Sequence, residues 1–266
     1  MEIYENIKYG PAQVQALDLY LPDCDHFPVF VYIHGGGFEN GSKKMDFIPA
    51  LCEKGVAVVS GEYRKYTDPD PAHYPDFIED GAAIVAWAKK HLAEYIADCH
   101  GESTEDGAAR MTHFYVGGSS AGGYVTQMLC FNPSYLAKHG LSGSDIDGWY
   151  HDAGQPTAHF NVLKERGLDY RRVIIDETAP LYYVDDSQRY APMEIVVSEH
   201  DIENRYEQTL LLISTLKHFG HDMDKVTLTY MEGWHHCKYM YEPAGQGNWI
   251  FADMIYEFIE RMERSL

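Results

Sequence analysis

The residues best suited to chemistry are a serine and the glycines around it. The segment 118–122 reads Gly-Ser-Ser-Ala-Gly and fits the pattern G-x-S-x-G, with Ser120 at its centre. An apolar run precedes it and a helical pattern follows, which predicts a sharp turn that exposes the hydroxyl as a nucleophile. A side chain at Gly118 or Gly122 would collide with the neighbouring strand or helix. The alternative is a glycine-rich turn whose serine has no chemical role.

A second glycine run offers hydrogen-bond donors. The sequence His-Gly-Gly-Gly-Phe at 34–38 directly follows an apolar run at 27–33. Backbone without side chains can turn its N–H groups toward a developing negative charge. We therefore expect the amides of Gly36, Gly37 and Ala121 to form an oxyanion hole. The alternative is a phosphate-binding turn, but neither G-x-G-x-x-G nor a P-loop lysine is present.

An acid is expected after a later strand. Asp201 follows an apolar run that ends at Ser198, and active-site groups of open α/β sheets gather at such carboxyl ends. Glu199 and Glu203 are the alternatives, and their positions favour them less.

A base is expected after the next strand. His235 and His236 follow the run 226–231, and either one fits the role. His200 is a weaker candidate because it precedes the acid Asp201. These histidines show no metal-ligand spacing such as H-E-x-x-H, so we expect neither a metal nor a cofactor.

The elements that must position these residues alternate between strand and helix. Buried strands are predicted over 27–33, 56–60, the residues before Gly118, 147–152, 194–198 and 226–231, after two short strands within 7–21. Helices are predicted over 45–54, 76–95, from the serine turn to about 132, 204–219 and 249–262, with loops over 66–75 and 98–110. This alternation predicts an α/β fold, a mostly parallel doubly wound sheet with helices on both faces.

The regular alternation breaks between about 134 and 192. We expect a single domain over 1–266, in which this segment supplies a small cap insert or lid. Two interpretations of its aromatic residues remain open, a lining for the substrate pocket or part of the core: Trp149, Tyr150, His159, Phe160, Tyr182 and Tyr183.

Composition excludes several classes of partner. The formal net charge of -20 argues against binding to nucleic acid or an anionic membrane. No apolar run approaches the roughly 20 residues that span a bilayer, and no signal peptide is visible. The five cysteines are dispersed and odd in number, which favours a reduced, cytoplasmic protein. Homodimerisation through an edge strand or the insert is a further hypothesis.

Taken together, the segments 34–38 and 118–123 resemble the HGGG-type, hormone-sensitive-lipase-like esterases of the α/β-hydrolase superfamily. The segments 16–22 and 74–80 are also similar to that group's opening strand and to the helix before its nucleophile. The resemblance covers almost the whole chain. It implies an α/β-hydrolase fold and a serine-hydrolase mechanism, and the order of serine, acid and histidine agrees with it.

Carried over by position, the resemblance implies that Ser120 is the nucleophile and Asp201 the acid. The family places its base three residues after a glycine, and Gly233 then favours His236 over His235. His34 is expected to order the glycine loop rather than to transfer protons.

The activity implied is that of a serine carboxylesterase acting on small-to-medium acyl esters through an acyl-enzyme. Acetyl or aryl esters of carbohydrates or plant-derived compounds are the substrates considered. Two alternatives remain, an amidase or peptidase that uses the same triad, and a hydrolase-like binding module without turnover.

Overall fold

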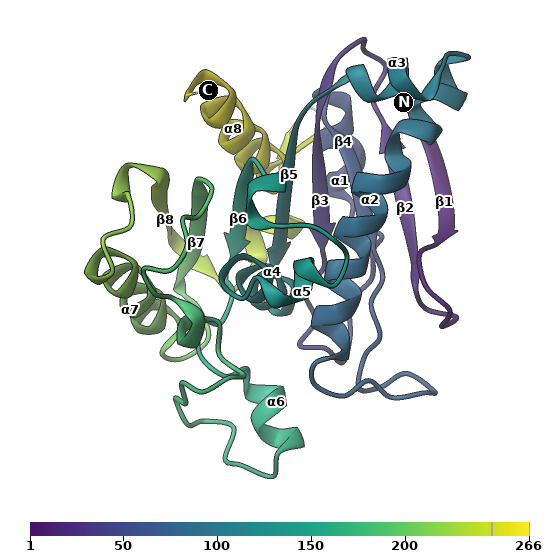
Figure 1. Cartoon of the computed structure of the whole chain (residues 1–266). Coiled ribbons are helices and arrows are strands. Elements are labelled where there is room, and N and C mark those ends of the chain that lie inside the picture. The colour runs from purple at the N-terminus through teal and green to yellow at the C-terminus, as the bar shows by residue number, and fades with distance from the viewer. Residues whose placement is uncertain (246, 266) are drawn as a thin grey trace.

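The computed structural model describes residues 1–245 and 247–265. Within them a central sheet of eight strands has the order β1-β2-β4-β3-β5-β6-β7-β8 (Figure 1). Its strands are β1 (Glu2–Lys8), β2 (Ala16–Leu21), β3 (Phe27–Ile33), β4 (Ala57–Gly61), β5 (Met111–Ser119), β6 (Gly148–Asp152), β7 (Met193–His200) and β8 (Val226–His235). β2 runs antiparallel to β1 and β4, and all other neighbours are parallel. The predicted mostly parallel sheet is confirmed.

The inner strands are buried on both faces. β4 is buried at every position, and β3 at all positions but Pro28, as expected for apolar runs in a parallel sheet covered by helices. β1 is an edge strand with mostly exposed side chains, and it begins at Glu2 rather than near Ile7. Its start was mispredicted because an exposed edge strand lacks an apolar pattern.

Helices cover both faces of the sheet (Figure 1). On one face, α1 (Phe47–Glu53) and α8 (Ile250–Ser265) share an apolar cluster with aromatic side chains of β3, β5 and β6. On the other, α2 (Asp76–His100), α4 (Ala121–Phe131) and α7 (Arg205–His218) contribute to a second cluster. The doubly wound arrangement is therefore confirmed.

Short elements complete the described chain. They are α3 (Thr104–Ala109), α5 (Ser134–Ala137), α6 (Phe160–Glu165), the 3₁₀ helices at Gly143–Asp145, Pro180–Tyr183, Met223–Lys225 and Lys238–Tyr241, and a two-stranded sheet of β9 (Pro243–Gly245) and β10 (Asn248–Trp249). No helix within the described residues is long and apolar enough to cross a membrane.

The prediction of a loop over 98–110 was wrong. α2 continues to His100, and α3 begins after Ser103. The Ser103 side chain accepts a hydrogen bond from the Asp106 amide at 3.2 Å. A serine followed three residues later by an acid is a helix-start signal, and the polar composition of the segment concealed it.

The segment outside the sheet is shorter than 134–192, because β6 lies between β5 and β7. Trp149 and Tyr150 belong to this strand and are core residues, at 1% and 0% exposure. The insert therefore follows Asp152. Its helix α6 and the flanking loops project beyond the sheet (Figure 1).

Candidate active site

The nucleophile turn lies between β5 and α4. Ser120 has φ 55° and ψ −112°, a region that a residue with a side chain occupies only when its surroundings hold it there. A Cβ added at Gly122 would lie 2.0 Å from the carbonyl oxygen of Ile33, and one at Gly118 would lie 2.6 Å from that of Gly122. The predicted strained turn and its demand for glycine are both present.

His236 lies next to Ser120, and Asp201 lies next to His236. The Ser120 hydroxyl donates to Nε2 of His236 at 2.7 Å, and Nδ1–H of His236 donates to Oδ1 of Asp201 at 2.6 Å. Asp201 also accepts from the amides of Ser198 and Ile202. Burial alone would raise the pKa of Asp201, but the hydrogen bond and charge of His236 outweigh burial and lower it. The carboxylate therefore stays ionised and fixes the imidazole.

The other candidates face elsewhere. The ring of His235 lies 5.1 Å from that of His200, centroid to centroid, and the carbonyl of His235 accepts from the Ser198 hydroxyl. Glu199 accepts from the amide of Gly233 at 2.7 Å. Of the two adjacent histidines, the structure brings His236 to the serine.

The glycine loop after β3 faces the same space. Gly36 and Gly37 have φ of 112° and 66°, and a Cβ at Gly36 would lie 2.1 Å from the carbonyl oxygen of Asn40. Their N–H groups have no hydrogen-bond partner within 1–245 and 247–265. The amide of Ala121 opens α4, where helical N–H groups lack intrahelical partners. Within the described part of the chain, the N–H groups of Gly36, Gly37 and Ala121 thus remain available as donors near Ser120.

His34 holds this loop. Its ring stacks on Tyr63 at 4.3 Å, and its nitrogens lie 2.9 Å from Oε1 of Glu62 and 2.7 Å from the carbonyl oxygen of Gly35. Burial would raise the pKa of Glu62, but hydrogen bonds from His34 and Lys65 and their charges lower it to about 2. The predicted ordering role of His34 agrees with these contacts.

A second aspartate, Asp152, lies next to the turn that carries Ser120. The backbone carbonyl of Asp152, at the end of β6, accepts from the Ser120 amide at 2.7 Å. Its side chain is fully buried and accepts from the hydroxyl of Tyr239 and the thiol of Cys237. Cys237 Sγ also lies 3.8 Å from Nε2 of His236. Burial raises the pKa of Asp152 to about 6.

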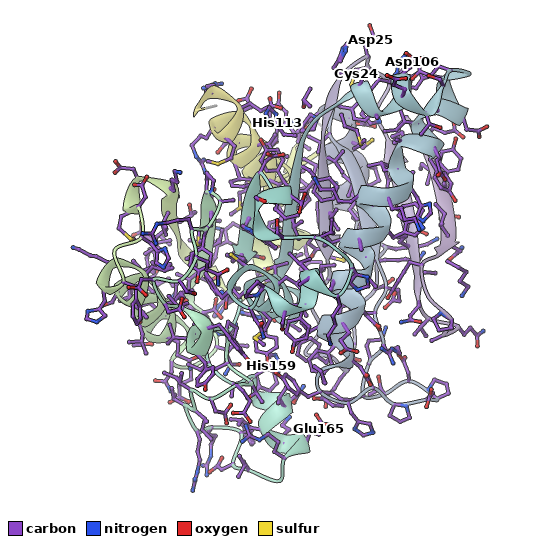
Figure 2. All side chains as sticks on the ribbon, viewed as in Figure 1. Cys24, Asp25, Asp106, His113, His159 and Glu165 are labelled. Carbon is purple, nitrogen blue, oxygen red and sulfur yellow. The ribbon has the colours of Figure 1, made fainter. Side chains whose placement is uncertain are left out.

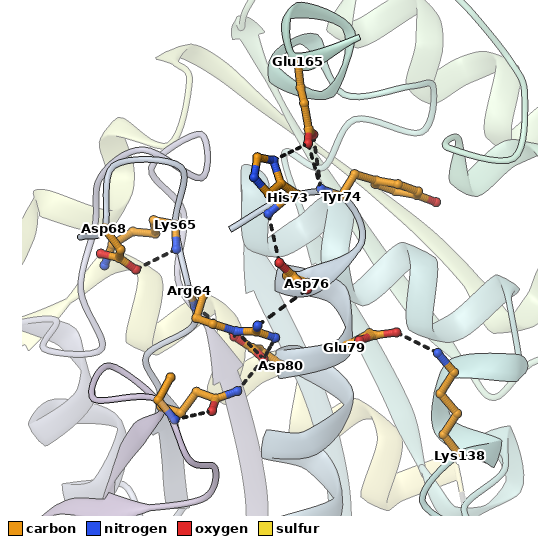
Figure 3. A network of polar contacts seen from close by, with 12 residues as sticks. Arg64, Lys65, Asp68, His73, Tyr74, Asp76, Glu79, Asp80, Lys138 and Glu165 are labelled. Carbon is orange, nitrogen blue, oxygen red and sulfur yellow. Dashed lines mark hydrogen bonds and ion pairs between the residues drawn. The ribbon is translucent and has the colours of Figure 1, made fainter. Parts of the chain in front are cut away.

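The insert is attached to the loops around the site. Nδ2 of Asn161 donates to the carbonyl of Gly37. Glu165 accepts from the hydroxyl of Tyr66 at 2.7 Å. Its carboxylate also lies 2.9 Å from Nδ1 of His73 (Figure 3). In Figure 2, His159 and Glu165 mark the two ends of α6. Side-chain hydrogen bonds thus hold α6 against the segments 34–38 and 66–75.

The chain just before the segment 66–75 is anchored to α2 through Arg64. The guanidinium of Arg64 makes two hydrogen bonds of 2.9 and 2.8 Å to the carboxylate of Asp80 (Figure 3). Asp80 is buried and also accepts from the side chain of Gln15 at 2.7 Å. Bidentate pairs of this kind fix geometry as well as adding energy.

These parts enclose a cavity of about 460 Å³, the active-site cavity, whose lining includes Gly36, Gly37, Ser120, Phe160, His236 and Tyr241. Of the six aromatic residues considered in the sequence as a pocket lining, Phe160 lines it. Tyr182 is 57% exposed, and Tyr183 donates to the carbonyl of Glu177. The described residues contain no group of three His, Cys, Asp or Glu side chains able to hold a metal ion.

Comparison with protein families decides the classification. The model described as the prolyl oligopeptidase family matches residues 82–262, which include Ser120, Asp201 and His236. The chain belongs to the prolyl oligopeptidase family. A second family model, BD-FAE, matches residues 17–137 of this family member. Both families lie within the α/β-hydrolase superfamily, so the predicted superfamily and fold are confirmed.

Curated relatives of this prolyl oligopeptidase family member align with part of the chain. Tuliposide A-converting enzyme b1 of Tulipa gesneriana is 35% identical over 139 residues, covering 47% of this chain and 34% of that protein. Esterase LipI of Mycobacterium tuberculosis is 31% identical over 130 residues, covering 45% and 35%. The aligned regions span about a third of each relative's length.

Solved structures match the fold over nearly the whole chain. A truncated carbohydrate esterase from gut microbiota has a TM-score of 0.72 at 18% identity, covering 99% of this chain and 97% of that one. Esterase B from Lactobacillus rhamnosis has a TM-score of 0.71 at 17% identity, covering 99% and 85%. At this identity the likeness concerns the fold.

Several residues of the site in this family member were not predicted from the sequence. Asp152 ends a strand beside that of Ser120, so the rule that identified Asp201 also applies to it. Asn161 and Glu62 carry no such signal, because each acts on a residue distant in sequence, Gly37 and His34 respectively.

Proposed function

We propose that this chain is a serine esterase that hydrolyses carboxylic esters through an acyl-enzyme. The observation that carries the proposal is the hydrogen-bonded line from Ser120 through His236 to Asp201, with distances of 2.7 and 2.6 Å. A serine, a base and an orienting acid in this geometry form a nucleophile ready for acyl transfer.

In the proposed mechanism, Ser120 attacks the ester carbonyl carbon while Nε2 of His236 takes the hydroxyl proton. Asp201 holds Nδ1–H and stabilises the imidazolium that forms. His236 then returns the proton to the leaving alcohol, and the acyl group remains on Ser120. Water, deprotonated by the same histidine, attacks the acyl-enzyme and releases the acid.

The developing oxyanion is assigned to the amides of Gly36, Gly37 and Ala121. Support comes from the two N–H groups of the glycine loop, which have no partner among the described residues, and from their place in the lining shared with Ser120. Donors aimed at developing charge are commonly worth roughly 10²–10³ in kcat each.

Small-to-medium acyl esters, including acetyl or aryl esters of carbohydrates, are the proposed substrates. The cavity of about 460 Å³ supports this size class, since small-molecule pockets measure roughly 300–1,000 Å³. Similar proteins agree with ester chemistry: one solved structure is that of a carbohydrate esterase, and one curated relative is named an esterase. A reducing, cytoplasmic location remains part of the proposal, supported by five cysteines that are all unpaired.

Amide hydrolysis is the second candidate, because the matching family is described as that of prolyl oligopeptidase. The same triad would cleave an amide if the leaving amine were protonated by His236. Turnover of an ester beside its matched amide separates the two. An ester-specific enzyme turns over only the ester, and a peptidase releases product from both.

The experiment that tests the esterase is hydrolysis of a chain-length series of p-nitrophenyl esters. We expect short acyl chains to be cleaved, and Ser120→Ala and His236→Ala to lose nearly all activity. His235→Ala is the matched control and should retain turnover, since its ring faces His200. If the wild type cleaves no ester or amide and an active-site serine probe fails to label Ser120, the chain is a binding module.

A further inference from the structure

A second cavity, of about 640 Å³, adjoins the active-site cavity and shares Phe160 and Ile202 with it. Four of its lining residues are basic and one is acidic: Lys164, Arg171, Arg172, Arg205 and Glu203. We call it the cationic cavity. Its charge is opposite to the formal net charge of -20 of the chain, so it attracts anions that the rest of the surface repels.

The floor of the cationic cavity is a buried guanidinium. Arg205 is 2% exposed and donates to the carbonyl of Ala153 and to Oε1 of Gln155. Within the described residues no carboxylate forms an ion pair with it, although Asp201 and Asp152 act on it from farther away. Burial lowers the pKa of Arg205. A buried cation with donors to spare is stabilised by an arriving anion.

The walls add two further cations, Lys164 and Arg172, and an aromatic surface. Neither Lys164 nor Arg172 forms an ion pair with any residue of the described ranges. Nζ of Lys164 lies 5.5 Å from the ring centre of Phe160 and 5.2 Å from that of Tyr170. By contrast, Arg171 is already paired with Asp169 at 2.7 Å.

We propose that the cationic cavity binds a carboxylate carried by the ester substrate, so that the enzyme prefers anionic esters over neutral ones. Phe160 would contact the part of the substrate between the scissile bond and the carboxylate, because it lines both cavities. Lys164 and Arg172 would pair with the carboxylate above Arg205. This inference rests on the proposed esterase function.

Two matched pairs of substrates test the preference. A carboxylate on the alcohol side is probed with para-carboxyphenyl acetate against para-carbamoylphenyl acetate. One on the acyl side is probed with mono-p-nitrophenyl adipate against p-nitrophenyl hexanoate. For one of the pairs we expect a higher kcat/KM with the charged ester, and a preference that declines as salt is added.

Variants at Lys164 and Arg172 test whether the cationic cavity causes the preference for charged esters. Lys164→Gln or Arg172→Gln should lower the charged-to-neutral ratio of kcat/KM by about ten-fold, the worth of one charge-assisted contact. Lys138→Gln is the matched control, because it removes an exposed charge paired with Glu79, outside the cationic cavity. That control should leave the ratio as in the wild type.

The outcomes separate this inference from the proposed function. Turnover of neutral esters without a charge preference, or with one that both variants retain, overturns the subsite and leaves the esterase standing. If no ester is cleaved, the esterase fails, and calorimetry with adipate or benzoate still tests the subsite. Binding that weakens in Lys164→Gln supports the subsite, and no binding to the wild type rejects it.

Discussion

The two sides of the active-site cavity are built by different interactions. On the sheet side, backbone packing fixes the position of Ser120. A Cβ at Gly122 would clash with the carbonyl of Ile33, and the Ser120 amide donates a hydrogen bond to the backbone carbonyl of Asp152. On the insert side, side chains attach α6, through Asn161 to the glycine loop and through Glu165 to the segment 66–75.

The difference predicts that the sheet side fixes the catalytic residues, whereas the insert side sets substrate selectivity. A backbone clash cannot be relieved without moving a strand, so the sheet side tolerates little change. Single hydrogen bonds at the insert are worth about 1 kcal/mol each, so the insert can vary while the triad is retained. Two of the cations of the proposed anion subsite, Lys164 and Arg172, lie on this side, on or near α6.

Asp201→Asn is expected to have the largest effect, on the sheet side. The amide no longer fixes the Nδ1–H tautomer of His236, and kcat should fall by roughly 10⁴ with little change in stability. Steady-state kinetics on a p-nitrophenyl ester measures it. Glu199→Gln is the control, since Glu199 bonds to Gly233 instead. Retained activity in Asp201→Asn together with its loss in Asp152→Asn would make Asp152 the orienting acid.

His151→Gln should change how stability depends on pH. His151 is fully buried in β6, and burial lowers its pKa from 6.5 to about 3. As the pH falls below 6.5, His151 takes up a proton in the unfolded chain but stays neutral in the folded one. Stability is therefore lost between about pH 6.5 and 3, by up to about 5 kcal/mol.

The variant removes this group, so its stability should fall less steeply over that range. Urea unfolding at several pH values compares it with the wild type and with His139→Gln, an exposed histidine. Equal slopes in the wild type and His151→Gln would mean that His151 is protonated in the folded state.

The sheet side of the active-site cavity could largely be predicted from the sequence, whereas the insert side could not. The sheet side depends on local patterns, so apolar runs and glycines predicted the strands and the strained turn at Ser120. The order of Ser120, Asp201 and a later histidine also followed from strand ends. Because His235 and His236 project differently from the end of β8, the pattern alone left both open, and the family's spacing favoured His236.

The insert side could not be predicted in this way. Asn161 bonds to Gly37 across 124 residues of sequence, and the cationic cavity gathers Lys164, Arg172 and Arg205 from separate segments. Such contacts arise from tertiary structure, and no period or motif in the chain encodes them. The aromatic residues between 134 and 192 were ambiguous for the same reason, since Trp149 lies in the core and Phe160 lines the cavity.

Gly122→Ala tests how tightly the serine turn is packed on the sheet side. A methyl group 2.0 Å from the carbonyl of Ile33 forces α4 away from β3, so we expect a loss of about 1–3 kcal/mol in the free energy of unfolding. Activity should fall as well, because the turn carries Ser120. Gly143→Ala is the control, since a Cβ there meets nothing within 4 Å. Equal denaturant midpoints for the two variants would contradict tight packing at the turn.

Asn161→Ala tests the insert side and should have the smallest effect. Without the hydrogen bond to the Gly37 carbonyl, the glycine loop loses its link to α6, and kcat should fall by about ten-fold. The free energy of unfolding should change by only about 1 kcal/mol. Glu165→Gln is the matched control on the same helix, because it alters the contact to the segment 66–75 and leaves the Gly37 link intact.

If both variants keep the wild-type kcat, α6 is independent of the oxyanion donors and acts on substrate selection alone. A fall confined to Asn161→Ala means instead that the insert helps to hold the machinery that the sheet side builds.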